Sequence, residues 1–209
     1  MARRIKEEPQ VHQNRIAEAA LKLFSRKGID QTKMDEIAKE AGYGKATLYV
    51  YFQNKEDIVS YLALQSMEKL CNAIAGAINK GEDTKERFLS VCHALASFQE
   101  AYPSFFDRSL EYIQVVQADD DSPLSQAYKK GEELNQMIHR CLSEGVERGE
   151  LEEIQNYFET IMEIWGMVSG LIKLSAEKAE YLETVGHISR EEFLAKGFER
   201  IYKMLNHSK

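Results

Sequence analysis

The chain has 209 residues, with 27 Lys and Arg against 34 Asp and Glu and a formal net charge of −7. That length is enough for one large or two small domains with hydrophobic cores. Only three residues are proline, and apolar residues recur at helical spacing over long windows, which predicts an all-α protein. No window approaches the roughly 18 consecutive apolar residues of a membrane span, and the N-terminus lacks the apolar core of a secretory signal. We therefore expect no membrane partner and a cytoplasmic protein.

The charge is divided unevenly along the chain. Residues 1–56 hold eleven Lys and Arg against eight Asp and Glu, a balance of +3. Residues 57–209 hold sixteen against twenty-six, a balance of −10. This asymmetry indicates a basic head that approaches an anionic partner and an acidic body that stays away from it.

The N-terminal part of the chain predicts three short helices. Residues 1–10 form a basic arm, either solvated or touching a nucleic-acid backbone, and residues 13–27 predict the first helix. Thr32 is placed to cap the second helix at its N-terminus. Gly42 ends that helix, because a sharp turn needs an open or left-handed backbone. A third helix begins near Gly44.

Two helices joined by a glycine-containing turn predict DNA binding, since the second helix of such a unit enters the major groove. Lys45 supplies a cation at the helix N-terminus, where phosphates also meet backbone N–H groups. Leu48 and Phe52 are expected to pack inward. The alternative is that the aromatic residues at positions 49, 51 and 52 form an ordinary packing cluster.

The stretch GKATLYVYFQNKE, residues 44–56, resembles the recognition helix and following turn of the TetR family of transcriptional regulators. Residues 15–24 and 27–29 are similar to the family's first helix, so the resemblance covers about the first quarter of the chain. It departs at Gly44, where Ser or Thr often caps the recognition helix, and at Tyr43, which is bulkier than usual. Residue chemistry and resemblance together give the expected DNA contacts: Thr32, Lys33, Gly44, Lys45, Thr47, Tyr49, Tyr51 and Lys55.

The remainder of the chain predicts six longer helices, which makes about nine in all. Their expected ranges are 55–79, 84–101, 103–117, 123–147, 155–178 and 190–206. Residues placed to cap them are Asn54, Asp83, Ser122 and Ser189. We expect a helix-turn-helix DNA-binding domain over residues 1–54. A ligand-binding and dimerisation domain is expected over residues 55–209.

The helix expected over residues 155–178 is apolar on nearly every face, so both of its sides require burial. Gly166 and Gly170 would let a second helix approach one face closely. The resemblance implies a homodimer built on this helix and the last one, and a twofold dimer suits a pseudo-palindromic operator in double-stranded DNA. The expected dimer contacts are Gly166, Gly170, Phe198, Ile201, Tyr202 and Leu205.

The resemblance also implies that the body binds a small effector. Ligand pockets are mostly apolar with a few placed polar groups, although Phe and Met at helical spacing more often form ordinary core. The expected pocket residues are Phe88, His93, Phe105, Phe106, Arg108, Tyr112, Met137, Met162 and Trp165. This set slightly favours a hydrophobic or aromatic effector.

Cys71, Cys92 and Cys141 lie on three expected helices without metal-ligand spacing, so we expect neither a metal nor a cofactor. No nucleophile elbow, P-loop, dinucleotide fingerprint or HExxH motif assigns an enzymatic reaction. The sequence predicts a DNA-binding transcriptional regulator, in the family's commonest mode a repressor, that an effector releases from its operator. Two alternatives stay open: a protein-interaction module with a non-functional DNA head, and a regulator that responds to thiols or metals.

Overall fold

The computed structural model describes residues 8–110 and 121–205, which contain ten α-helices and no strand, so the expected all-α class is confirmed. The helices are α1 (Pro9–Lys27), α2 (Met34–Glu40), α3 (Lys45–Tyr51), α4 (Lys55–Ile78), α5 (Thr84–Ala101), α6 (Pro103–Ser109), α7 (Pro123–Glu147), α8 (Tyr157–Glu177), α9 (Ala179–Thr184) and α10 (Arg190–Met204). None of the described helices is both long and apolar enough to cross a membrane.

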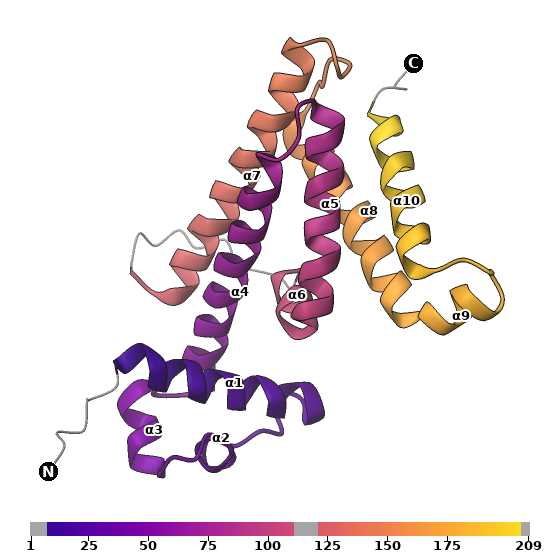
Figure 1. Ribbon diagram of the computed structural model, residues 1–209. Helices are drawn as coiled ribbons and strands as arrows, with labels where there is room; N and C mark the ends of the chain where they lie inside the picture. The colour runs from indigo at the N-terminus through magenta and orange to yellow at the C-terminus, as the bar shows by residue number, and fades with distance from the viewer. Residues whose placement is uncertain (1–7, 111–120, 206–209) are drawn as a thin grey trace, which may run out of the picture.

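Figure 1 shows two parts joined by one long helix. Helices α1, α2 and α3 form the lower part of the view, which we call the head. Helix α4 rises from the head into a bundle with α5, α7, α8 and α10, which we call the body. Helix α6 lies at the end of the body nearest the head.

The head has its own hydrophobic core, where its three helices meet the start of α4. Ile16 of α1, Ile37 of α2 and Leu48 of α3 are fully buried there. Ile58 and Leu62 of α4 pack into the same cluster. The first two turns of α4 thus complete the head core, although the expected domain boundary lies at the start of this helix.

The body core is larger and takes in α4, α5, α6, α7, α8 and α10. Its buried members include Leu70, Ile74, Phe88, Phe98, Phe106, Leu134, Leu142, Val168, Ile172 and Phe198. Phe105 of α6 packs against both the body core and the head core. Helices α4 and α6 are therefore the elements through which packing is continuous between the two parts.

Four helix starts follow the capping residues expected from the sequence. The side-chain oxygens of Asn54, Asp83, Ser122 and Ser189 each accept a hydrogen bond from the backbone N–H three residues later. Such caps satisfy backbone donors that the first helical turn leaves without a partner. These four sequence predictions are confirmed.

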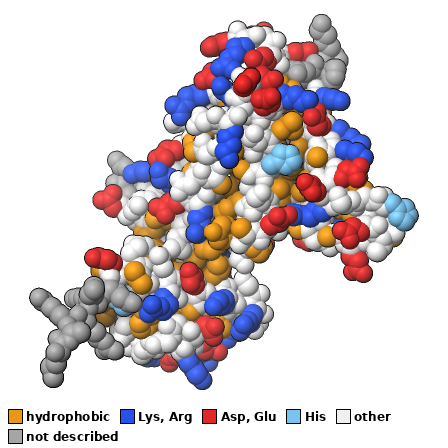
Figure 2. Space-filling model, viewed as in Figure 1, with side chains coloured by type: hydrophobic (Ala, Val, Ile, Leu, Met, Phe, Trp, Pro, Cys, Tyr) orange, Lys and Arg blue, Asp and Glu red, His pale blue; other side chains and the backbone are white. Residues whose placement is uncertain are grey.

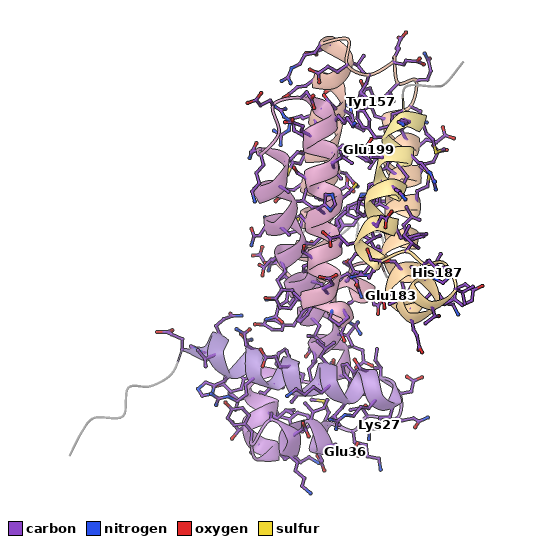
Figure 3. All side chains as sticks on the ribbon, turned by 45° about the vertical axis from the view of Figure 1, so that its right-hand side comes forward. Lys27, Glu36, Tyr157, Glu183, His187 and Glu199 are labelled. Atoms are coloured by element: carbon purple, nitrogen blue, oxygen red, sulfur yellow. The ribbon has the colours of Figure 1, made fainter. Side chains whose placement is uncertain are left out.

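The expected cap of α2 is wrong. Thr32 is 1% exposed, and its hydroxyl donates to the carbonyl of Gly28 at 2.8 Å instead of capping the helix. The N-cap residue is Lys33, whose backbone N–H is accepted by the Glu36 carboxylate at 2.9 Å. The same carboxylate accepts the Lys27 ammonium at 2.7 Å, and Figure 3 shows these two side chains reaching toward one another at the end of α1.

Other helices also differ from the sequence prediction. Helix α1 begins at Pro9 rather than at residue 13, because proline suits the first helical position. The helix expected over residues 103–117 ends earlier, as α6 with Leu110 at its C-cap, and residues 111–120 lie outside the described part. Helix α9 was not expected; it fills part of the presumed loop between α8 and α10.

Candidate functional site

The turn between α2 and α3 has the geometry that the sequence predicts. Gly42 has φ +74°, a left-handed conformation that residues with a Cβ rarely adopt. The N–H of Tyr43 donates to the carbonyl of Ala38 at 2.8 Å, and the N–H of Gly42 donates to the carbonyl of Lys39 at 3.1 Å. These two bonds form a Schellman motif, which ends α2 and directs the chain into α3.

Helix α3 has one buried side and one exposed side. Leu48 is fully buried and Phe52, just after the helix, is 4% exposed, as the sequence predicts. Val50 is 74% exposed and Tyr49 is 36% exposed. Lys45 and Thr47 are also exposed. An exposed helix face on a firmly packed helix is what major-groove insertion requires.

Val50 was missed in the sequence analysis. Its exposure follows from its place between Leu48 and Phe52, which both face inward one turn apart. At about 100° per residue, a position midway between two residues on the inner face of a helix points outward. The helical period alone could therefore have identified this residue.

An acidic side chain lies beside the expected phosphate contact. The Lys45 ammonium is 2.9 Å from the Asp35 carboxylate, and both side chains are more than 60% exposed. The hydrogen bond from Lys45 to Asp35 raises the pKa of the lysine above its ordinary value, so the amine stays protonated. A phosphate at this place has to compete with Asp35 for the ammonium. The exposed Lys33 lies at the start of α2 on the same part of the head.

Tyr51 is held by residues of α1. Its ring stacks on His12 at a centroid distance of 5.3 Å and an interplanar angle of 28°. His12 Nδ1 is 2.7 Å from the Tyr43 hydroxyl, and Arg15 donates to the same hydroxyl at 2.8 Å. This cluster fixes α1 against both the turn and α3. It also holds the half-buried Tyr51 ring in one orientation.

Thr32 and Lys55 take part in bonds within the head rather than standing free on its surface. Thr32 is buried, as described above. The Lys55 ammonium donates to the carbonyls of Ile29 at 2.8 Å and Asp30 at 3.2 Å. Both side chains hold the loop between α1 and α2, and Lys55 ties this loop to the start of α4. The structure therefore supports neither as a free phosphate contact, because their polar groups are already used.

The head surface carries charges of both signs. Figure 2 shows Lys and Arg side chains over the lower part of the view, with Asp and Glu side chains among them. This mixture agrees with the modest balance of +3 in residues 1–56. Binding through such a surface depends on a few placed cations and should be sensitive to salt.

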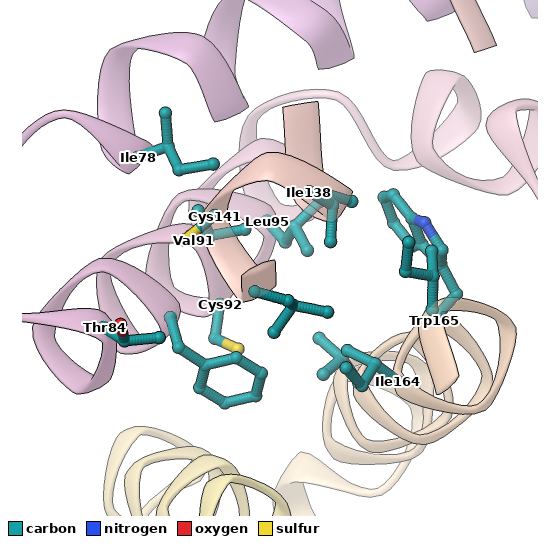
Figure 4. Close-up of a pocket in the computed structure, with 13 residues that line it drawn as sticks. Ile78, Thr84, Val91, Cys92, Leu95, Ile138, Cys141, Ile164 and Trp165 are labelled. Atoms are coloured by element: carbon teal, nitrogen blue, oxygen red, sulfur yellow. The ribbon is translucent and has the colours of Figure 1, made fainter. Parts of the chain in front are cut away.

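The body contains a narrow apolar cavity between α4, α5, α7 and α8, which we call the slot. Its volume is about 40 Å³, and its accessible wall is apolar. Figure 4 shows its lining side chains arranged around the open space, with Trp165 on one side and Ile78 on the other. The full lining set is Ile78, Thr84, Phe88, Val91, Cys92, Leu95, Ile138, Cys141, Leu142, Ile161, Ile164, Trp165 and Val168.

Few of the expected pocket residues line the slot. Phe88 and Trp165 do, and Met137 lines an adjoining groove. The aliphatic wall of the slot was missed, because Ile, Leu and Val at helical spacing look the same whether they border a cavity or fill a core.

The other expected pocket residues lie elsewhere. His93 is exposed, with its ring edge-on to Phe198 at 5.6 Å. Arg108 lines a separate surface hollow between α1 and α6, and Met162 is 40% exposed. Phe105 and Phe106 belong to the packing around α6, and Tyr112 lies outside the described residues.

The expected dimer contacts fall into two groups. Gly166 and Gly170 lie on the outer side of α8, where an added Cβ would meet no atom within 4 Å. The α10 residues Phe198, Ile201, Tyr202 and Leu205 pack into the core of their own chain. They are therefore not a free surface for a partner, because α10 packs against α5 and α8.

An apolar stripe on α8 was only partly anticipated. Phe158, Met162 and Leu174 are 69%, 40% and 49% exposed. Together with Gly166 and Gly170 they recur every four residues and are all exposed, so neighbouring members adjoin in a row that winds slowly around the helix. The opposite side of α8 packs into the body core. The expectation that α8 is buried on both sides therefore requires a partner for this stripe.

The cysteines are separate thiols in this fold. Cys71 and Cys92 are buried and Cys141 is half-buried, and none is in a disulfide. Burial raises the pKa of all three thiols above the ordinary value, most strongly for Cys92. Within residues 8–110 and 121–205 no three His, Cys, Asp or Glu side chains are grouped to hold a metal ion.

The helix-turn-helix head with its exposed α3 defines a DNA-binding transcriptional regulator. Residues 16–62 match the family model for bacterial regulatory proteins of the tetR family. The biofilm operon icaADBC negative transcriptional regulator IcaR of Staphylococcus aureus is 24% identical over 200 residues, covering 92% of this chain and 96% of that protein.

Solved structures show the same fold. The TetR family regulator PfmR of Thermus thermophilus superposes with a TM-score of 0.70 at 24% identity, covering 93% of this chain and 100% of that one. The regulator FadR of Bacillus subtilis in complex with stearoyl-CoA gives a TM-score of 0.69 at 19% identity, covering 94% and 98%. The match over residues 16–62 places the head of this chain in the TetR family of transcriptional regulators.

Proposed function

We propose that the protein is a homodimeric repressor that leaves its operator when an apolar effector enters the body. The observation that carries the proposal is the exposed side of α3, presented on a helix whose other side is fully buried at Leu48. IcaR, a relative along nearly the whole chain, is described as a negative transcriptional regulator, which supports repression. We propose that residues 1–54 bind DNA and residues 55–209 bind the effector and the partner.

The DNA contacts that we propose lie on the exposed side of α3 and at the start of α2. They are Lys33, Gly44, Lys45, Thr47, Tyr49 and Val50. Lys33, Lys45 and the backbone N–H groups at the start of α3 suit phosphates, whereas Thr47, Tyr49 and Val50 suit base edges. Tyr51 assists from the side, where His12 stacks on its ring.

The partner subunit covers the apolar stripe of α8 in this proposal. Two copies related by a twofold axis would each bury Phe158, Met162 and Leu174 against the other chain. Met162→Glu should shift the protein toward monomer in sedimentation velocity, because it places a charge in an apolar contact. Val11→Glu, at a comparably exposed position on α1, is the control and should leave the dimer intact.

The slot is the proposed effector site. Its apolar wall suits a hydrocarbon chain or ring, and FadR of Bacillus subtilis, of the same fold, is described in complex with stearoyl-CoA. Ile78, at the C-terminal end of α4, borders the slot, while Ile58 near the other end packs in the head core. An effector acts by preferring one placement of α4 over another, which changes the separation of the two heads.

The test of DNA binding is fluorescence anisotropy with DNA from upstream of the coding region, or with sites from random-sequence selection, against scrambled DNA. Wild type should bind its selected site tightly at low salt. Lys45→Ala should weaken binding and reduce the salt slope by about one unit. Lys80→Ala, just beyond the far end of α4, is the matched control and should change neither. Equal binding of selected and scrambled DNA would contradict the proposal and favour an interaction module with a non-functional head.

A further inference from the structure

A solvent-open groove adjoins the slot and is chemically different from it. The groove has a volume of about 340 Å³ and lies between the end of α4, the start of α5 and α7. It is lined by Ala75, Ile78, Asn79, Arg87, Met137, Arg140, Cys141 and Glu144. Ile78 and Cys141 line both the slot and the groove, so these two side chains form the shared boundary.

The charges at the groove favour an anion. Arg87 donates to Glu144 at 2.8 Å, and Arg148 donates to the same carboxylate at 3.1 Å. Arg140 is exposed and forms no ion pair with any residue that the structure describes. Glu150 lies close by, where its carboxylate accepts a backbone N–H. Of the charged residues that line the groove, Arg87 is paired with Glu144, so the Arg140 guanidinium is available for a ligand.

The apolar slot therefore opens toward a groove that carries an available arginine. A tail in the slot would have no polar group to contact, because the accessible wall there is apolar. A head group in the groove would meet Arg140 and the edge of Arg87, and guanidinium groups bind carboxylates in bidentate geometry. Met137, with its flexible thioether, borders the path from the groove and can adjust to the ligand.

We propose that the effector is an amphipathic anion with an unbranched apolar tail and a carboxylate head. The tail passes between Ile78 and Cys141 into the slot, and the carboxylate stays in the groove on Arg140. This inference rests on the proposed effector site and adds to it the charge and shape of the ligand. The slot widens on binding, since about 40 Å³ admits only part of a tail.

Trp165 is the natural reporter for this site. It is the single tryptophan of the chain and lines the slot, so a tail that reaches it changes its fluorescence. The probes are octanoate, octan-1-ol and acetate, which separate the tail from the charge. Octanoate should bind about tenfold more tightly than octan-1-ol, since a hydrogen bond to a charged group contributes about 1.5 kcal/mol or more. Acetate should leave the fluorescence unchanged.

Arg140→Gln tests the head group. This variant should bind octanoate about tenfold more weakly and octan-1-ol as wild type does, because only the charged contact is lost. Arg26→Gln, an exposed arginine on α1 far from the groove, is the matched control and should bind both probes like wild type. Circular dichroism of both variants checks that the fold is intact.

The outcomes separate this inference from the proposed effector site. Equal binding of octanoate and octan-1-ol, unaffected by Arg140→Gln, would overturn the anionic head while leaving an apolar effector site in place. No fluorescence change with either tailed probe would overturn both the slot as an effector site and the inference built on it. A preference for octanoate that Arg140→Gln does not reduce would place the head group elsewhere and refute the groove.

Discussion

The two sides of α3 give the sharpest test of how the head is built. Leu48→Ala removes a fully buried side chain from the head core, and such changes cost about 2–5 kcal/mol. Val50→Ala removes methyl groups from a side chain that is 74% exposed, so little buried area is lost. Alanine also has a higher helix propensity than valine, by up to roughly 0.7 kcal/mol. We therefore expect the first variant to lose stability and the second to keep it.

Urea denaturation followed by circular dichroism measures the difference. With slopes of about 1–3 kcal/mol per molar urea, a loss of about 3 kcal/mol lowers the midpoint by about 1 M or more. DNA binding should depend on Val50. The Val50→Ala variant should bind the selected site about tenfold more weakly than wild type and should bind scrambled DNA as wild type does. Equal destabilisation by the two variants, or unchanged site preference in Val50→Ala, would refute the orientation of α3 described above.

Three further outcomes are expected. Gly197→Ala should destabilise the protein by about 1–3 kcal/mol, because the added Cβ would lie 2.7 Å from a leucine side chain of α8. Gly76→Ala should be neutral or stabilising, because a Cβ there meets no atom within 4 Å, and urea titration compares the two variants. Asp35→Asn should strengthen DNA binding at low salt, since Lys45 loses its competing acidic partner, and anisotropy tests this. Burial raises the pKa of the Cys141 thiol, so Cys141 should react slowly with iodoacetamide at about pH 7 and faster as the pH rises. Bound octanoate should protect Cys141 from this reaction, and mass spectrometry measures both effects.

The fold could be predicted from the sequence because its signals are local. Helix starts at Asn54 and Ser189 follow from a side chain that reaches an N–H three residues away, so no knowledge of tertiary contacts is needed. Gly42 marks the helix-turn-helix turn for the same reason, since its positive φ excludes most other residues. The inward side of α3 follows from spacing along one helix.

The sites could be predicted only in part, because their residues depend on how helices pack. Thr32 has a side chain that commonly caps helices, yet its hydroxyl donates a hydrogen bond to the carbonyl of Gly28. Lys55 has the charge of a phosphate contact, yet a loop from α1 to α2 uses its ammonium. Phe198 has the pattern of an interface residue, but α10 turns it into the core of its own chain. In each case the sequence identified the chemistry of the side chain, but the contact that the side chain makes depends on how distant elements pack.

The packing of α4 and α6 supports the proposal that a small ligand in the body controls the head. Helix α4 has 24 residues, about 36 Å in length, and its two ends pack in different cores. Helix α6 adds a second link, since Phe105 touches both cores and the Ser104 hydroxyl lies 3.3 Å from that of Ser25 in α1. Close-packed helices shift as rigid bodies rather than deform. In the proposed mechanism, widening the slot at Ile78 would move the head with α4, and two heads that must match half-sites about 34 Å apart would tolerate little such movement.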